Sequence, residues 1–139
     1  HHSTEKMAYS VAEGIMSEGV EVKMYFMQED GADDVVSDVL DSKAIAVGAP
    51  TMMNNPFPRI GNTMYWFNCL NFKQTTSIKK ALVFSSKGWG GGAVKKLEES
   101  LEGAGFEIFD DVETTFTPTE EILEECYEAG KKLAKTIKE

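Results

Sequence analysis

Three stretches of this sequence combine residue types that can hold a ligand. The first is HHSTE at residues 1–5, where the hydroxyls of Ser3 and Thr4 adjoin the start of a helical pattern. Free N–H groups at a helix N-terminus attract anions, and nearby hydroxyls can donate further hydrogen bonds. We therefore predict a phosphate site at Ser3 and Thr4. The alternative is that one of these residues serves only as a helix N-cap.

A second candidate stretch is the loop sequence GAPTMMNNPFPRIG at residues 48–61, which follows a short apolar run. It holds three prolines, and proline fixes the shape of a loop because its ring restricts the backbone. Met52 and Met53 fit no periodic apolar pattern, and adaptable thioether side chains suit contact with a flat aromatic ligand. A proline-rich connection that covers the end of a sheet would explain the same residues.

The third stretch is SSKGWGGGA at residues 85–93, which places Trp89 among glycines directly after the apolar run ALVF. Glycines let backbone N–H groups approach a ligand closely, and tryptophan offers a flat face for stacking. The alternative is that Trp89 packs on a neighbouring helix. Together, a phosphate site, a shaped loop and an aromatic loop predict a phosphorylated planar ligand, and flavin mononucleotide (FMN) fits that description.

The elements that must position these stretches are alternating helices and strands. Apolar residues recur at helical spacing in five segments, and short β-rich or continuous apolar runs separate them. Gly19 is placed to end the first helix and Thr119 to cap the last one. Val94, Leu97 and Leu101 should face the core. The expected helices cover 3–19, 33–40, 58–70, 91–105 and 117–139, and the expected strands cover 20–27, 43–50, 79–86 and 106–116.

This alternation with short connections predicts an α/β fold, a doubly wound parallel sheet in three layers (α/β/α). The runs at 43–50 and 79–86 are continuously apolar, as expected of strands buried on both faces, whereas 106–116 is polar enough for an edge strand. Ligands bind outside the carboxyl ends of such strands, so all three candidate stretches should lie at one edge. Because a helix comes first, we expect the central first strand to lie outside this sequence.

The composition limits the partners and sites of the chain. Its 139 residues suit a single domain over 1–139, and the formal net charge of −9 argues against binding to nucleic acid or to an anionic membrane. No apolar stretch approaches the ~20 residues that span a bilayer. Cys69 and Cys126 lack C-x-x-C spacing, which favours thiols in a reducing cytoplasm. With only His1 and His2 we expect no zinc site, although a purely carboxylate metal site stays open.

The same stretches resemble a known family. The order of elements is similar to that of flavodoxins, and HHSTEKMAYSVAEG resembles the phosphate loop and first helix of one branch. That branch is the flavodoxin-like domain of flavodiiron proteins (A-type flavoproteins), which include the methanogen deazaflavin-dependent oxidases. AIAVGAPTMMNNPFP is similar to its G-[AS]-P-T loop, and SSKGWGGGAVKKLEESLEGAGFEI to its G-S-x-G-W-x-G-x-A-V segment. The resemblance covers the whole chain and implies a flavodoxin-like fold that binds FMN and transfers electrons.

Carried over to this sequence, the resemblance assigns residues to both ends of the cofactor. Ser3 and Thr4 would hold the FMN phosphate, with His2 beside them. Two loops would sandwich the isoalloxazine ring and leave one edge open to electron transfer, and backbone groups near Met53 and Asn54 would bond the central-ring nitrogen. The implied loop residues are Pro50, Thr51, Met52, Met53 and Asn54 on one side and Ser86, Lys87, Gly88, Trp89, Gly90 and Gly91 on the other.

The chain departs from that family in lacking the H-x-E-x-D-H sequence of a diiron domain. Reduction of oxygen or nitric oxide is therefore not assigned to this chain alone. We expect it to work with a redox partner protein or a diiron domain, with a deazaflavin or a rubredoxin-type protein as electron donor, and as a homo-oligomer. No catalytic acid, base or nucleophile is expected, because the redox chemistry would belong to the flavin.

Two other functions compete with this interpretation. A flavodoxin-like domain that has lost FMN could serve as a binding or assembly module. A phosphoacceptor receiver domain shares the strand order, but it requires acids at the end of a first strand and gives no role to Trp89 and its glycines.

Overall fold

The fold is given by a computed structural model, which describes residues 2–25, 38–39, 42–48, 79–87, 93–115 and 117–138. Besides the helical residues 38 and 39, this part of the chain contains three helices and three strands. In chain order they are α1 (His2–Met16), β1 (Ala44–Gly48), β2 (Lys80–Lys87), α5 (Ala93–Ala104), β3 (Glu107–Thr115) and α6 (Glu120–Lys138).

The three described strands form one parallel sheet in the order β1-β2-β3. Gly48 of β1 lies opposite Phe84 of β2, which in turn lies opposite Val112 of β3. The register between β2 and β3 shifts at Phe109, the extra residue of a β-bulge. Parallel neighbours need a crossover connection, and α5 supplies it between β2 and β3. The predicted parallel α/β sheet is confirmed.

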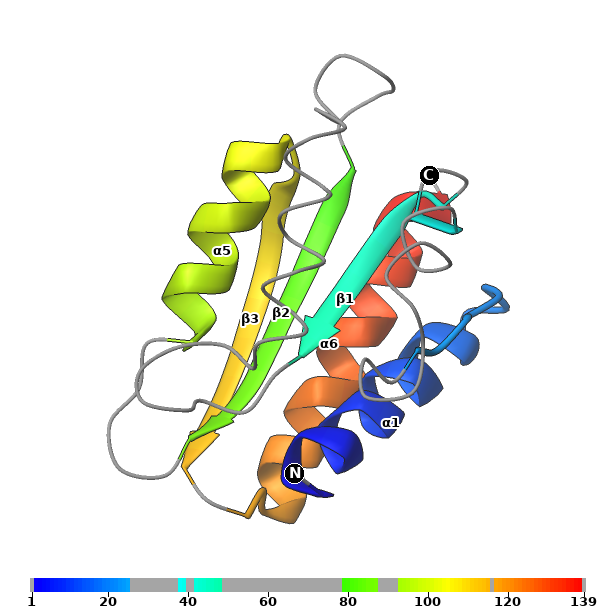
Figure 1. Cartoon of the computed structure of the whole chain (residues 1–139). Coiled ribbons are helices and arrows are strands. Elements are labelled where there is room, and N and C mark those ends of the chain that lie inside the picture. Colours follow the sequence, from blue (N-terminus) through cyan, green and yellow to red (C-terminus); the bar gives the residue numbers. More distant parts are fainter. Residues whose placement is uncertain are drawn as a thin grey trace.

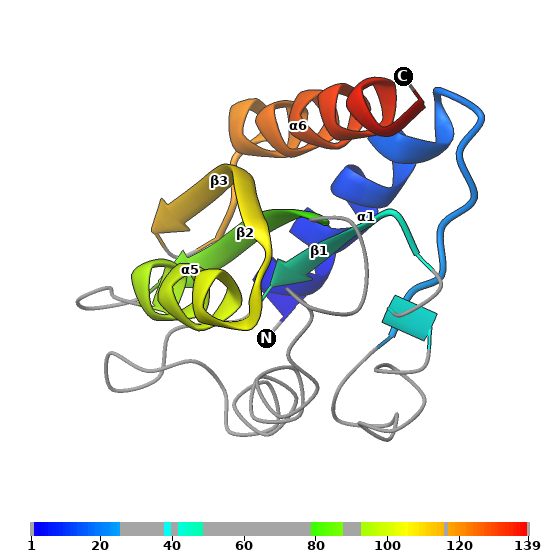
Figure 2. The ribbon, with the colours of Figure 1, turned by 90° about the horizontal axis from the view of Figure 1, so that it is seen from above.

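Helices cover both faces of this sheet, as three layers require. Figure 1 and Figure 2 show α5 on one face and α1 with α6 on the other. The side chains of β2 alternate between these faces. Ala81 and Val83 belong to the core beneath α5, whereas Leu82 and Phe84 belong to the core beneath α1 and α6. All four are at most 4% exposed, so β2 is buried on both faces as predicted.

The predicted inner face of α5 is also confirmed, and α6 shows the same kind of buried face. In α5, Leu97 and Leu101 are fully buried, and Val94 packs partly buried against the same core. In α6, Cys126 and Leu133 are buried in the core that α6 shares with α1. Apolar residues at helical spacing therefore predict correctly which face each helix turns to the sheet.

The helix ends follow ordinary capping chemistry. Thr119 caps α6, because its Oγ1 accepts a hydrogen bond from the N–H of Ile122 at 3.3 Å. Gly19 follows α1 with a φ of 78°, and Gly105 follows α5 with a φ of 107°. Glycine adopts this left-handed backbone without steric cost, which confirms the predicted end of the first helix at Gly19.

Two glycines allow α1 and α6 to approach each other closely. A Cβ at Gly14 would lie 2.0 Å from the carbonyl oxygen of Tyr127, and a Cβ at Gly130 would lie 2.3 Å from that of Val11. Both distances are far below any real carbon–oxygen contact. The side-by-side placement of these helices therefore depends on the absence of side chains at Gly14 and Gly130.

Two expectations from the sequence are wrong. The segment 20–27 is predicted as a strand, but residues 20–25 form none, and 26–27 lie outside the described residues. A strand needs a neighbour to satisfy its backbone groups, and its own alternating pattern supplies none. The run 43–50 is predicted as doubly buried, but β1 is half-buried and Ala46 is exposed. Among the described strands, β1 pairs only with β2.

The described residues test the predicted helix over 33–40 only in part, and they do not test the one over 58–70. In the segment 33–40, residues 38 and 39 are helical and Val39 joins the core beneath α5. The predicted helix over 58–70 lies outside the described residues.

The close approach of α1 and α6 is open to a direct test. We expect Gly130→Ala to lower the free energy of unfolding by about 1–3 kcal/mol, because the new methyl group would overlap the Val11 carbonyl. The matched control is Gly103→Ala on the exposed face of α5, where alanine should stabilise the helix by up to about 1 kcal/mol. Urea unfolding measures both, and equal effects of the two substitutions would contradict the packing described here.

Candidate functional site

The carboxyl edge of the sheet brings several chain segments together. The described strands end there at Gly48, Lys87 and Thr115, and α1, α5 and α6 begin on the same side of the molecule (Figure 1). Helix N-termini carry unsatisfied N–H groups and the positive end of the helix dipole. Segments from distant parts of the sequence therefore meet where α/β proteins bind ligands.

A buried hydrogen bond joins the first and third candidate stretches at this edge. The Oγ1 of Thr4, in the first turn of α1, lies 2.8 Å from the Oγ of Ser86, near the end of β2. These residues are 82 positions apart in the sequence, and they are only 8% and 7% exposed. Either hydroxyl can be the donor. The predicted meeting of these stretches is thus present at one well-defined contact.

The polar end of β2 contrasts with its apolar centre. Ser85 is fully buried, and its hydroxyl donates a long hydrogen bond of 3.4 Å to the carbonyl of Ser86. Because side chains alternate along a strand, Ser85 lies on the α5 face and Ser86 on the α1 face. Of these two consecutive serines, only Ser86 therefore places its hydroxyl against the start of α1.

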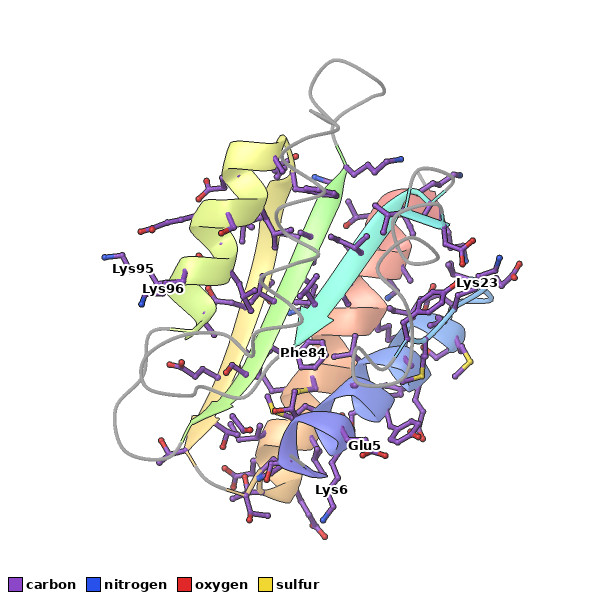
Figure 3. All side chains as sticks on the ribbon, viewed as in Figure 1. Glu5, Lys6, Lys23, Phe84, Lys95 and Lys96 are labelled. Carbon is purple, nitrogen blue, oxygen red and sulfur yellow. The ribbon has the colours of Figure 1, made fainter. Side chains whose placement is uncertain are left out.

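Gly48 and Phe84 fix the point at which the second candidate stretch leaves the sheet. A Cβ at Gly48 would lie 2.0 Å from the Cε2 atom of the Phe84 ring. The ring therefore covers the backbone of Gly48, which is the last residue of β1 and the first residue of the stretch 48–61. Figure 3 shows Phe84 beside the end of β1 and next to α1. Any larger residue at position 48 would displace this ring.

The structure describes only some of the residues predicted for the site. Ser3 and Thr4 lie inside the first turn of α1, because the helix begins at His2. The N–H groups of a first turn have no helical acceptor, so this placement still leaves donors for an anion. For His2 and Lys87 only the backbone is described. The predicted residues Pro50, Thr51, Met52, Met53, Asn54, Gly88, Trp89, Gly90 and Gly91 lie outside the described residues.

Two of the contacts at this edge were not predicted from the sequence. The bond between Thr4 and Ser86 and the contact between Phe84 and Gly48 both join residues from different strands or helices. The one local signal was the pair Ser85 and Ser86 directly after four apolar residues, since a polar pair at the end of a buried strand needs hydrogen-bond partners.

Outside this edge, one carboxyl group has a strongly altered acidity. Glu98 of α5 has its pKa raised from 4.5 to about 7 by a hydrogen bond with the Asp111 carboxyl of β3, then by burial and by the negative charges of Asp111 and Glu102. Its Oε1 atom is buried without a hydrogen-bond partner among the described residues. A shared proton between the two carboxyl groups relieves their repulsion.

The described residues offer little for other chemistry. Burial, followed by the charge of Glu125, raises the pKa of the Cys126 thiol to about 12, so this thiol stays protonated. In the described ranges no three His, Cys, Asp or Glu side chains gather as a metal site. None of the helices described here is both long enough and apolar enough to cross a membrane.

Comparison with known proteins identifies the family. Residues 1–130 match the family described as "Flavodoxin". The chain belongs to the flavodoxin family. It is 46% identical over 139 residues to the coenzyme F420H2 oxidase of Methanocaldococcus jannaschii, a match that covers 100% of this chain and 33% of that protein. The chain spans about a third (33–34%) of the length of the curated relatives it matches first.

Solved structures agree with this assignment. The flavodiiron protein from Giardia intestinalis superimposes with a TM-score of 0.92 at 28% identity, over 99% of this chain and 34% of that one. A flavodoxin from the domain Archaea superimposes with a TM-score of 0.84 at 26% identity, over 99% of this chain and 92% of that one. The predicted flavodoxin-like fold and the resemblance to the flavin module of flavodiiron proteins are confirmed.

FMN is the cofactor of this flavodoxin family. The described residues fit the phosphate end of that molecule in donor chemistry. A phosphate accepts hydrogen bonds only, and the first turn of α1 offers free N–H groups together with the hydroxyls of Ser3 and Thr4. The near-complete burial of Thr4 and Ser86 excludes water from their mutual hydrogen bond.

The contact between Gly48 and Phe84 gives a prediction about stability. We expect Gly48→Ala to lower the free energy of unfolding by about 1–3 kcal/mol, because the added methyl group would overlap the Phe84 ring. Phe84→Leu in the Gly48→Ala background should recover part of that loss by removing the ring edge. Chemical unfolding of the four proteins in this cycle measures the coupling, and additive losses would contradict the contact.

The altered acidity of Glu98 gives a prediction about pH. Its pKa in the folded protein, about 7, lies above the ordinary value of 4.5. Its contribution to stability is therefore complete below about pH 4.5 and is lost as the pH rises through 7. We expect the unfolding free energy of the wild type to fall relative to Glu98→Gln between about pH 5 and 8. The exposed Glu99→Gln on the same helix is the control, and a parallel pH profile of all three proteins would refute the prediction.

Proposed function

We propose that this chain binds FMN at the carboxyl edge of its sheet and acts as an electron-transfer module. The observation that carries the proposal is the buried contact between Thr4 and Ser86, which brings the predicted phosphate stretch against the predicted ring stretch. Membership of the flavodoxin family supports the same cofactor. The matches to a flavodiiron protein and to a free flavodoxin support the same role.

In this proposal the residues of the chain hold the cofactor and tune its surroundings. Ser3 and Thr4 hold the phosphate, with His2 beside them and with the positive end of the α1 dipole behind them. FMN supplies the electron storage, and the protein supplies position, exclusion of water and local charge. The stretch Pro50–Asn54 and the stretch Ser86–Gly91 would form the two walls of the ring site.

The negative charge of the chain has a consequence for the potential of the flavin. The formal net charge is −9 over 139 residues. An additional negative charge near acids and in a low dielectric is disfavoured, as for any buried anion. Such surroundings would favour a protonated reduced ring, and backbone groups near Met53 and Asn54 would supply its hydrogen-bond partners.

We further propose that this module works in series with other redox groups. A relative that the chain matches is named as an oxidase of reduced coenzyme F420. This chain has no H-x-E-x-D-H sequence. Its electrons would therefore come from a deazaflavin or a rubredoxin-type protein and pass to a diiron domain or a partner protein, in a cytoplasmic homo-oligomer.

Binding of FMN is the direct test of this function. We expect the purified chain to bind one FMN, with a flavin absorbance spectrum and quenched flavin fluorescence. Trp89→Ala should weaken binding about tenfold through loss of the stacking face, whereas Trp89→Phe should retain most of the affinity. Titration of the three proteins with FMN measures this.

Absence of FMN binding by the wild type would contradict the proposal and favour the assembly module instead. Equal affinity of Trp89→Ala and the wild type would remove Trp89 from the ring site while leaving the cofactor in place.

A further inference from the structure

We infer that Ser86 is a positioning residue for the phosphate end of the cofactor, acting through the hydroxyl of Thr4. In this arrangement Ser86 donates its proton to Thr4, which leaves the Thr4 proton for a phosphate oxygen. Ser86 lies in the stretch 85–93, and it thus contributes to recognition of the phosphate that the stretch 1–5 binds. The inference rests on the proposed binding of FMN.

The geometry of the pair is that of a strong, dry hydrogen bond. The distance of 2.8 Å between the two oxygens is the usual value for hydroxyl pairs. With Thr4 8% and Ser86 7% exposed, water has little access to either oxygen. The bond is therefore retained in the folded protein rather than exchanged for bonds to solvent.

One hydroxyl proton of the pair has no acceptor among the described residues. Two hydroxyls carry two protons, and their mutual hydrogen bond uses only one of them. Within the described residues, neither side chain has another hydrogen-bond partner. A buried donor left without an acceptor costs free energy, so the second proton needs an oxygen to receive it. A phosphate, which only accepts, supplies such an oxygen.

The position of Thr4 decides which proton faces the ligand. Thr4 lies in the first turn of α1, where free N–H groups and the helix dipole favour an anion. Ser86 lies on β2, one residue before its end at Lys87. An anion at α1 therefore takes the proton of Thr4, and the mutual bond can then form only if Ser86 donates.

The orientation of both groups is fixed by the elements that carry them. Thr4 is β-branched and sits in a helix, which restricts its side chain to two rotamers. Ser86 is held by the pairing of β2 with β3, in which it lies opposite Thr114. A hydroxyl that accepts one bond while donating another is polarised, and both bonds become stronger. Loss of the Ser86 hydroxyl should therefore weaken the bond from Thr4 to the phosphate.

A comparison of FMN with riboflavin isolates this effect, because riboflavin has the same ring and no phosphate. The quantity to measure is the ratio of the two affinities, by fluorescence titration, in the wild type, Thr4→Val, Thr4→Ser, Ser86→Ala and the double variant Thr4→Val/Ser86→Ala. We expect Thr4→Val to lower the preference for FMN about tenfold and Ser86→Ala about three- to fivefold. Thr4→Ser keeps the hydroxyl and should retain most of the preference, and the double variant should match Thr4→Val.

Other outcomes would overturn the inference in distinct ways. If Ser86→Ala weakens FMN and riboflavin equally, Ser86 is only part of the ring wall. If its effect adds in full to that of Thr4→Val, the two hydroxyls act independently. Both results leave the proposed function intact, whereas a wild type that binds neither molecule removes the function and the inference together.

Unfolding of each variant without ligand separates positioning from stability. A purely structural role would lower stability without changing the ratio of the two affinities. Should Ser86→Ala not fold, Ser86→Cys provides a second test, because the thiol is close in size and a weak donor. It is expected to lower the FMN preference as well, and an unchanged preference would overturn the inference.

Discussion

The burial of β2 on both faces is the constraint on which the rest of the structure depends. Residues 81–84 of this strand supply both cores, with alternate side chains beneath α5 and beneath α1 with α6. A parallel strand in this position must be apolar along its centre, and its end must reach the edge where helices begin. The fold thereby sets where polar side chains can appear on β2, and Ser85 and Ser86 occupy that place.

The same constraint explains how distant stretches of sequence form one site. Ser86 can bond to Thr4 only because α1 lies against the face of β2 that carries Leu82, Phe84 and Ser86. The close contact of α1 with α6 through Gly14 and Gly130 holds α1 in that position. The packing of α1 against α6 thus helps to set the geometry of the Thr4 and Ser86 hydroxyls at the carboxyl edge of the sheet.

Much of the fold could be predicted from local patterns, and the site only in outline. Two local patterns are strong indicators of structure, because only one burial pattern fits each of them. They are the helical spacing of Leu97 and Leu101 and the apolar run of β2. The segment 20–27 has the alternation of a strand, but pairing depends on a neighbour that no local pattern specifies. The contact of Thr4 with Ser86 spans 82 residues, so only the three-dimensional arrangement reveals it. The family motifs predicted that the first and third stretches lie at one edge, but they did not predict this bond.

The measurement that tests the central claim most directly is a crystal structure of the chain with FMN bound. We predict a phosphate oxygen within hydrogen-bond distance of Thr4 Oγ1, at about 2.5–3.0 Å, with the bond between Thr4 and Ser86 retained. A phosphate bound away from the first turn of α1, or a Ser86 hydroxyl turned away from Thr4, would contradict it.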